Sequence, residues 1–322
     1  MTTARTHRLA PLAAALLLAC AAETPTDADR FGVEPHFNSS EGPEWSAPEH
    51  LGAVVNSASR DENATLSADG LSLYFASDRP GGVGNVDVWV TRRDSRSSPW
   101  QAPVNLGPPV NTPFIDGAPS LSPDGHLLFI HSNRTGSLGG NDIWVAHRSG
   151  GNDEDDWTMP VSLGTDVNSA DDEQGPEYVA SDGGGALYFN RGNQGMQQAD
   201  LYRVGIQRDG TTEGPAQPLT VLNAVGANDS APTLRADARE ILFWSNRSGG
   251  LGGTDIWVST RESANHPWSA PENAGAPLNT PVADLHPELT QDALTLFFSS
   301  DRPGGVGSTD LWMSNRAASA KR

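Results

Sequence analysis

SDRPGGVGNVDVWV, at residues 77–90, decides the fold of this chain, because four further copies of it follow. The copies are SNRTGSLGGNDIWV at 132–145, NRGNQGMQQADLYRV at 190–204, SNRSGGLGGTDIWV at 245–258 and SDRPGGVGSTDLWM at 300–313. The Asp that precedes the aromatic residue in each copy is Asp87, Asp142, Asp200, Asp255 or Asp310, at separations of 55, 58, 55 and 55 residues. Such regular spacing predicts a repeat architecture.

Each repeat divides into four strand-like pieces. The first pieces are DENATLS (61–67), DGAPSLS (116–122), EQGPEYV (173–179), DSAPTLR (229–235) and DLHPELT (284–290). A tight turn follows, Asp-Gly in the clearer copies, and then an apolar piece such as LYFAS (73–77). The third piece begins at the repeated Asp, and the fourth begins with Trp and has Pro three positions later, as in Trp100 and Pro103. Four short antiparallel strands per repeat are typical of a propeller blade.

The two ends of the chain share the last blade. The fifth repeat stops after its third strand, and the missing Trp-x-x-Pro piece stands at the front, beginning at Trp45. Trp45 precedes Asn56 by 11 residues, the same spacing as Trp100 to Asn111. We therefore predict an all-β fold, a five-bladed β-propeller of four-stranded blades whose last blade is completed by the N-terminal strand.

The N-terminus reads as a lipoprotein-type signal peptide over residues 1–20. A basic start precedes a short apolar core that ends at Cys20, the only cysteine of the 322 residues. Lipid attached to Cys20 would tether the protein to a membrane without spanning it, and Ala21 favours the outer membrane. The alternative is an ordinary cleaved signal. Residues 21–40 are expected to form a flexible spacer, residues 41–317 the propeller, and residues 318–322 a tail.

The repeat pattern D-x-x-P-x-L-S-P-D-G, followed by L-Y-F-x-S-x-R-x-G-G-x-G-x-x-D-I-W, resembles the TolB-type, WD-like β-propeller repeat of bacterial envelope proteins. The resemblance covers residues 41–317 and implies a propeller that docks a protein partner. The α/β domain that precedes the TolB propeller has no counterpart in residues 1–40, so a stand-alone propeller is expected.

Composition narrows the range of partners. The formal net charge of −19 repels nucleic acid and anionic membranes, so we expect no nucleic-acid binding and membrane contact through the lipid alone. One cysteine allows no disulfide within the chain, so stability must come from burial. A monomer is expected.

Residues present in every blade are expected to build the blade, whereas residues present in one blade are free for function. The repeated Asp87 follows a Gly-rich turn, where its carboxylate can accept backbone N–H bonds and pair with Arg79, eight residues earlier. The repeated aromatic residues are expected to pack between blades: Trp89, Trp144, Tyr202, Trp257 and Trp312.

A second set of acids begins the innermost strands, which line the channel of a propeller. This candidate binding or cation ring comprises Asp61, Asp116, Glu173, Asp229 and Asp284, joined by His286. We expect no cofactor, although carboxylates that face one another could hold a cation such as Ca²⁺. The alternative is that each acid caps its own turn. His131 and Trp244 also occur in a single blade.

The leading functional expectation is a non-enzymatic, envelope-anchored binding or scaffold propeller that mediates protein–protein interaction, with an envelope protein or a glycan as partner. One alternative is a carbohydrate-binding, lectin-like propeller. The last alternative is a glycoside hydrolase, which needs two carboxyl groups in different environments. Acids repeated by symmetry argue against that differentiation.

Overall fold

The computed structural model describes residues 45–149, 156–193 and 198–317 besides Met1. The predicted signal with Cys20, the spacer over 21–40 and the tail over 318–322 lie outside this part, as do residues 150–155. No helix in the described ranges is long and apolar enough to cross a membrane.

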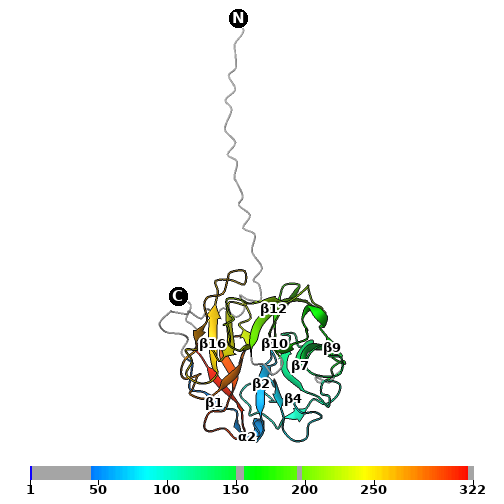
Figure 1. Cartoon of the computed structure of the whole chain (residues 1–322), viewed down its shortest axis with the longest axis vertical. Coiled ribbons are helices and arrows are strands. Elements are labelled where there is room, and N and C mark those ends of the chain that lie inside the picture. Colours follow the sequence, from blue (N-terminus) through cyan, green and yellow to red (C-terminus); the bar gives the residue numbers. More distant parts are fainter. Residues whose placement is uncertain (2–44, 150–155, 194–197, 318–322) are drawn as a thin grey trace. The chain divides into compact units, whose positions relative to one another are not determined.

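Five four-stranded antiparallel sheets make up the described chain, and they follow one another around a ring (Figure 1). Blade 1 comprises β2 (Asp61–Leu66), β3 (Ser72–Ser77), β4 (Asp87–Arg92) and β5 (Val104–Asn105). Blade 2 comprises β6 (Asp116–Leu121), β7 (Leu127–Ser132), β8 (Asp142–His147) and β9 (Val161–Ser162). Blade 3 comprises β10 (Asp172–Ser181), β11 (Gly184–Gly192), β12 (Ala199–Gln207) and β13 (Gln217–Pro218). Blade 4 comprises β14 (Asp229–Leu234), β15 (Glu240–Ser245), β16 (Asp255–Thr260) and β17 (Glu272–Asn273).

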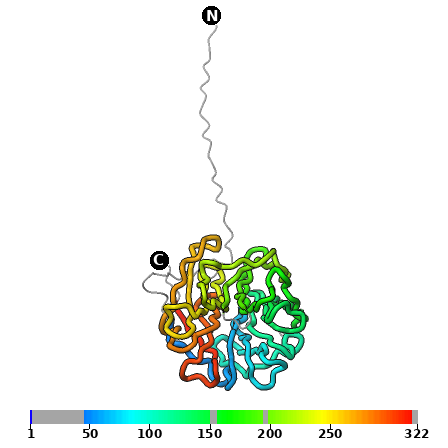
Figure 2. Tube along the Cα trace, viewed as in Figure 1, coloured from blue at the N-terminus to red at the C-terminus, as the bar shows by residue number. Residues whose placement is uncertain are grey.

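Blade 5 contains both ends of the described chain, as predicted. It comprises β18 (Asp284–Leu289), β19 (Thr295–Ser300), β20 (Asp310–Asn315) and the N-terminal β1 (Glu49–His50). Trp45 bridges to Arg316, and Ser46 N donates to Asn315 O at 2.7 Å. The blue and red ends of the trace therefore run side by side (Figure 2). The five-bladed architecture and its closure are confirmed.

Helix is almost absent from the described residues, which hold one short α-helix, α2 (Gly52–Val55), and one 3₁₀ turn, η1 (Gly164–Asp166). An asparagine stands 11 residues after the Trp that begins the fourth piece of a repeat, and it follows the short helix or turn, as Asn56 and Asn168 do. Asn111 shows its role: its Oδ1 accepts from Val88 N and its Nδ2 donates to Val88 O, both at 2.9 Å. The same side chain thus fastens the outer connection of the blade to its third strand, and Asn56 does so to Leu311 across the closure.

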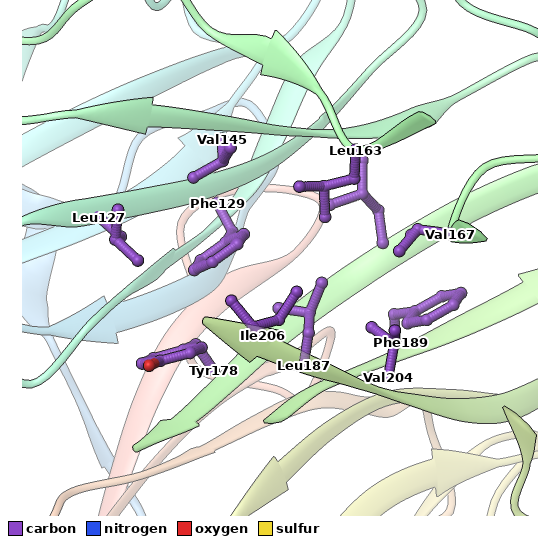
Figure 3. Close-up of a cluster of buried hydrophobic side chains, with 11 residues drawn as sticks. Leu127, Phe129, Val145, Leu163, Val167, Tyr178, Leu187, Phe189, Val204 and Ile206 are labelled. Carbon is purple, nitrogen blue, oxygen red and sulfur yellow. The ribbon is translucent and has the colours of Figure 1, made fainter. Parts of the chain in front are cut away.

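The apolar second strands form the centre of each blade because neighbouring blades cover both of their faces. All six residues of β3 are buried, which explains why its apolar run does not alternate with polar residues. Figure 3 shows the core between blades 2 and 3, where Phe129 and Tyr178 stack with ring centroids 5.4 Å apart. The strand-3 aromatics pack between blades as expected, and Trp89 is 7% exposed.

Each innermost strand contains a β-bulge two residues after its first acid. The bulged residues all have left-handed backbone angles: Asn63 (φ 52°), Ala118 (44°), Gly175 (57°), Ala231 (46°) and His286 (49°). A bulge turns the neighbouring side chains and is common beside functional sites. Four of these five residues line the cavity described below.

Candidate functional site

The predicted acidic ring does not face the channel. Each of its five carboxylates is fully buried inside its own blade. Asp116 is representative: Oδ1 accepts from Arg134 Nη2 at 2.5 Å and from Ser132 Oγ at 2.6 Å. Its Oδ2 accepts from Thr112 N at 2.5 Å. The same arginine pairing is found in every blade: Asp61–Arg79, Glu173–Arg191, Asp229–Arg247 and Asp284–Arg302. The second of the two expected roles, an acid that caps its own turn, describes this geometry.

This pairing also corrects the partner expected for the repeated arginines. Arg79 contacts Asp61, whereas Asp87 accepts backbone N–H bonds from its Gly-rich loop, from Val83 at 2.6 Å and from Gly84. The loop amides satisfy Asp87, so the arginine reaches back to the innermost strand of the same blade. In the described ranges no group of three or more His, Cys, Asp or Glu side chains is placed to hold a metal ion.

A cavity of about 180 Å³ lies at the mouth of the channel, on the face that carries the starts of the innermost strands. Its lining combines titratable and polar side chains from different blades. Those used below are Arg60, Glu62, His131, Asn190, Ser230, Trp244 and His286. We call this cavity the axial pocket. Of the sequence candidates it includes His286 and the single-blade residues His131 and Trp244, but none of the five acids.

Two columns of the repeat supply seven of the fifteen lining residues. They are the residue after the first acid of the innermost strand and the residue that pairs with it on the second strand. The pairs are Glu62 with Ala76, Gly117 with His131, Gln174 with Asn190, Ser230 with Trp244, and Leu285 with Ser299. The side chains in both columns change from blade to blade, while the columns beside them are repeated. That contrast is the sequence signal that could have located the pocket.

Several polar atoms of the axial pocket have no hydrogen-bond partner among the described residues. They include Asn190 Nδ2, Ser230 Oγ, Trp244 Nε1 and the Nδ1 atoms of His131 and His286. Asn190 is 1% exposed and Ser230 is 2% exposed. Buried polar groups are almost always paired in native proteins, so a cluster of unpaired ones around a cavity indicates a site for a polar ligand or ordered water.

Glu62 and Asp78 are two carboxyl groups in contrasting environments on either side of Arg60. Burial raises the pKa of Glu62, and the nearby charge of Asp78 raises it further. The charge of Arg60, whose Nη1 lies 3.7 Å from Glu62 Oε1, lowers the pKa but does not outweigh burial. Asp78 is more exposed. Burial opposes ionisation there too, but the backbone and side chain of Arg60 donate to it at 2.8 and 3.0 Å and lower its pKa.

The two histidines of the axial pocket are held neutral. Burial lowers the pKa of His131 to about 4. Burial, followed by the charge of Arg60, lowers the pKa of His286 to about 3. A neutral imidazole presents one donor and one acceptor, so both rings can exchange hydrogen bonds with hydroxyl groups.

Below the axial pocket, a series of four hydrogen bonds links the five blades around the channel. We call it the channel ring; it comprises Thr65, Ser120, Glu177, Thr233 and Glu288, one residue from each innermost strand. Ser120 donates to Glu177 at 3.2 Å, Thr65 donates to Glu288 at 2.9 Å, and the Thr233 hydroxyl lies 3.4 and 3.3 Å from the two carboxyl groups. Burial raises the pKa of Glu177, and burial together with the charge of Glu177 raises that of Glu288.

A larger cavity of about 520 Å³ lies at the opposite face, beside the β14–β15 turn. Its floor is Trp268, with the guanidinium of Arg261 4.0 Å from the ring centroid. The same pair recurs as Arg93–Trp100, Arg148–Trp157 and Arg316–Trp45. Because each arginine also donates to a carbonyl of its hairpin turn, this feature builds the blade.

Comparison with protein-family models gives no match, and no curated protein matches the sequence. The fold itself matches solved structures. A thermostable family-43 glycoside hydrolase superposes with a TM-score of 0.58 at 10% identity, over 81% of this chain and 91% of that one. An α-L-arabinofuranosidase of Podospora anserina and an endo-arabinase of Bacteroides thetaiotaomicron each give 0.56, at 11% and 16% identity, over 85% of this chain and 97% of theirs.

These structures correct the expectation that the chain is not an enzyme, because the propellers it matches are glycoside hydrolases. They support the glycoside-hydrolase alternative over the protein-binding scaffold, and they give no support to the TolB-type assignment. The five repeated acids argued against catalysis because they share one environment. Glu62 and Asp78 lie outside that set and differ in environment, so the argument does not apply to them. At such low identity the likeness establishes the fold alone.

Proposed function

We propose that this protein is a glycoside hydrolase that cleaves a glycan at the axial pocket, with arabinose-containing polymers as the first substrates to test. The observation that carries the proposal is the pair of carboxyl groups, Glu62 and Asp78, whose pKa values are shifted in opposite directions beside a polar cavity. The enzymes with the same fold act on arabinans and arabinofuranosides, as their names state.

Glycoside hydrolysis needs one carboxyl group that is protonated and one that is ionised. Glu62, with its raised pKa, keeps its proton to higher pH than an ordinary glutamate and is the general acid that protonates the leaving oxygen. Asp78, with its lowered pKa, remains ionised, as the base or nucleophile must be. Arg60 lies between them and stabilises the charge on Asp78.

The rate of hydrolysis should depend on pH through both carboxyl groups. Activity requires protonated Glu62, so it falls as pH rises through the raised pKa of Glu62. It also requires ionised Asp78, so it falls as pH drops through the lowered pKa of Asp78. The pH–rate profile is therefore bell-shaped, and Glu62→Gln abolishes the rate together with the alkaline limb.

Two substitutions test the roles, and the repeat itself shows that both new side chains fit. Glu62→Gln introduces the residue that blade 3 carries at the same position, Gln174. Asp78→Asn introduces the residue of blades 2 and 4, where Asn133 and Asn246 accept the equivalent backbone N–H at 2.8 Å. Each should lower kcat on arabinan or arabinoxylan by about 10²- to 10⁴-fold with little change in Tm.

Asp301→Asn is the matched control. Asp301 holds the position of Asp78 in blade 5 and accepts from Ala283 N at 2.8 Å. Neither carboxylate lines the axial pocket itself, but Asp78 is bound by Arg60 of the pocket, whereas the donor to Asp301 is an alanine outside it. It should leave activity unchanged. Release of reducing sugar from a panel of neutral plant and bacterial polysaccharides is the assay. Absence of turnover across the panel, or full activity in Glu62→Gln, would contradict the proposal.

The N-terminal features remain part of the same proposal. We infer from residues 1–20 that Cys20 carries lipid and holds the enzyme at the outer membrane, where a glycan is its partner. Loss of the protein from the membrane fraction on Cys20→Ser would support this, and unchanged fractionation would contradict it.

A further inference from the structure

We infer that the axial pocket binds one terminal, uncharged sugar residue and recognises its hydroxyl groups through His131, Asn190 and Ser230. This inference rests on the proposed function for the nature of the ligand, and it adds the size, the charge and the determinants of recognition. Three observations carry it: the volume of the pocket, the orientation of its unpaired polar atoms, and the absence of a cation available to a ligand.

The volume limits the ligand. The axial pocket measures about 180 Å³, below the roughly 300 Å³ at which sites for drug-sized molecules begin. Further along the same strands, hydrogen bonds of the channel ring connect residues of all five blades across the channel: Ser120, Glu177, Thr233, Glu288 and Thr65. A ligand therefore enters from the face and ends in the pocket, which suits a chain end better than the interior of a polymer.

Asn190 is oriented by the neighbouring blade. Its Oδ1 accepts from Ala231 N at 3.0 Å, which fixes the amide and leaves Nδ2 as a donor without a partner among the described residues. Gly175 leaves space for this amide, because a Cβ there would come within 2.9 Å of Asn190 Oδ1. A hydroxyl oxygen of a sugar is the acceptor that this donor lacks.

Gly117 provides the space that the side chain of His131 occupies. A Cβ on Gly117 would approach His131 Nε2 to 2.9 Å, so a larger residue at that position would require the imidazole to shift. The Nδ1 atom of His131 is buried and unpaired among the described residues, as is the hydroxyl of Ser230 two blades away. Donors and acceptors thus surround the cavity from blades 2, 3 and 4, as recognition of several hydroxyl groups requires.

The charges of the axial pocket exclude an acidic sugar. Arg60 is the one arginine or lysine among its lining residues, and it is already engaged by Asp78 at 3.0 Å and by Glu62 at 3.7 Å. His131 and His286 are neutral near pH 7. A uronic acid would bring a carboxylate toward Glu62 with no cation to receive it, whereas a neutral sugar meets only hydrogen-bonding groups.

Binding of free monosaccharides tests this inference without hydrolysis. We would titrate the full-length protein at pH 7 with L-arabinose, D-xylose, D-galactose and D-galacturonate, using calorimetry and intrinsic tryptophan fluorescence. At least one neutral sugar should bind, and D-galacturonate should bind at least tenfold more weakly. Ser230→Ala and His131→Phe should each weaken the neutral sugar by about 2- to 10-fold.

Ser299→Ala is the matched control, because Ser299 occupies the corresponding strand column, is fully buried and is also unpaired, yet does not line the axial pocket. It should leave sugar binding unchanged. Both serine variants should keep the wild-type Tm, since each removes a hydroxyl without a partner among the described residues, so a loss of affinity in Ser230→Ala alone is not a folding defect.

The outcomes separate the two proposals. Polymer hydrolysis without binding of any monosaccharide, or equal affinity for D-galacturonate, would overturn the single-residue, neutral-sugar pocket and leave the hydrolase standing. Binding of a neutral sugar that Ser230→Ala weakens, with no hydrolysis of any polymer, would support the pocket and overturn the hydrolase.

Discussion

At the scale of single residues, the chain uses carboxylates in two different ways. Asp116 and its equivalents are fully buried and neutralised by an arginine of the same blade, so they build the blade. Glu62 and Asp78 are partly exposed and share one arginine at the mouth of the channel. A buried ion pair contributes little net stability when intact, but removing one partner leaves an uncompensated charge and costs about 3–5 kcal/mol.

Asp116→Asn should therefore destabilise the protein strongly. Arg134, itself 7% exposed, would lose its carboxylate, so we expect the free energy of unfolding to fall by about 3 kcal/mol or more. Asp78→Asn breaks a pair with exposed side chains and should cost less than about 1 kcal/mol. Urea denaturation of both variants measures the difference. Equal, small losses would show that the buried pair is not needed.

The repeat predicted the structural residues better than the site. Asp87, Asn111 and Trp89 recur in register, and recurrence reports the backbone and packing needs that all blades share. Glu62, Asn190 and Ser230 carry no such mark, because a site assembled at the axis draws its residues from several blades, so no spacing along the chain identifies it. His131, Trp244 and His286 were recognised as single-blade residues, but their meeting at one cavity depends on the bulges, which have no sequence signature at Ala118, Ala231 or His286.

At the scale of elements, β1 is the strand on which closure depends. It contributes only two residues to the sheet, Glu49 and His50, but Trp45 beside it is buried under Arg316, whose guanidinium lies 4.6 Å from the ring centroid. Asn56 adds two hydrogen bonds to Leu311, at 2.8 and 3.0 Å. Closure therefore comes from side chains anchored on both sides of a short strand.

A chain that begins at Ser57 should consequently be less stable than one that begins at Glu41. The shorter chain loses Trp45, β1 and Asn56, and leaves β20 as an open edge, so we expect a loss of at least about 3 kcal/mol. Thermal melts of both proteins measure the difference. A synthetic peptide of residues 45–56 should restore stability to the shorter chain; equal melting temperatures without the peptide would contradict closure by this strand.

At the scale of the whole molecule, the channel ring joins all five blades through two carboxyl groups and three hydroxyl groups. No lysine or arginine takes part in it, and burial raises the pKa of both Glu177 and Glu288. The folded protein therefore binds protons that the unfolded chain releases above a pH of about 4.3. Stability from this source is complete below that pH and is lost as pH rises through the raised pKa values.

Replacing both acids should remove this dependence. Glu177→Gln with Glu288→Gln keeps the hydrogen-bonding groups but not the charges, so its stability should decline less than that of the wild type between pH 5 and pH 8. Each unit of pKa shift corresponds to about 1.4 kcal/mol. Parallel stability–pH curves for the two proteins would show that the channel ring is not the source. Asp301→Asn serves again as the control.

The shared last blade also sets the order in which the protein can be finished. Ser46 must wait for Ser314, 268 residues later, before their hydrogen bond can form. At a synthesis rate of about 5–20 residues per second, that wait is on the order of 10–50 s. A polypeptide terminated before β20 can never form the complete fifth sheet, whatever the quality of its other blades. β1 and β20 can therefore complete the fifth sheet only when both are present. An incomplete translation product leaves a strand edge unpaired, which makes it more accessible to a protease.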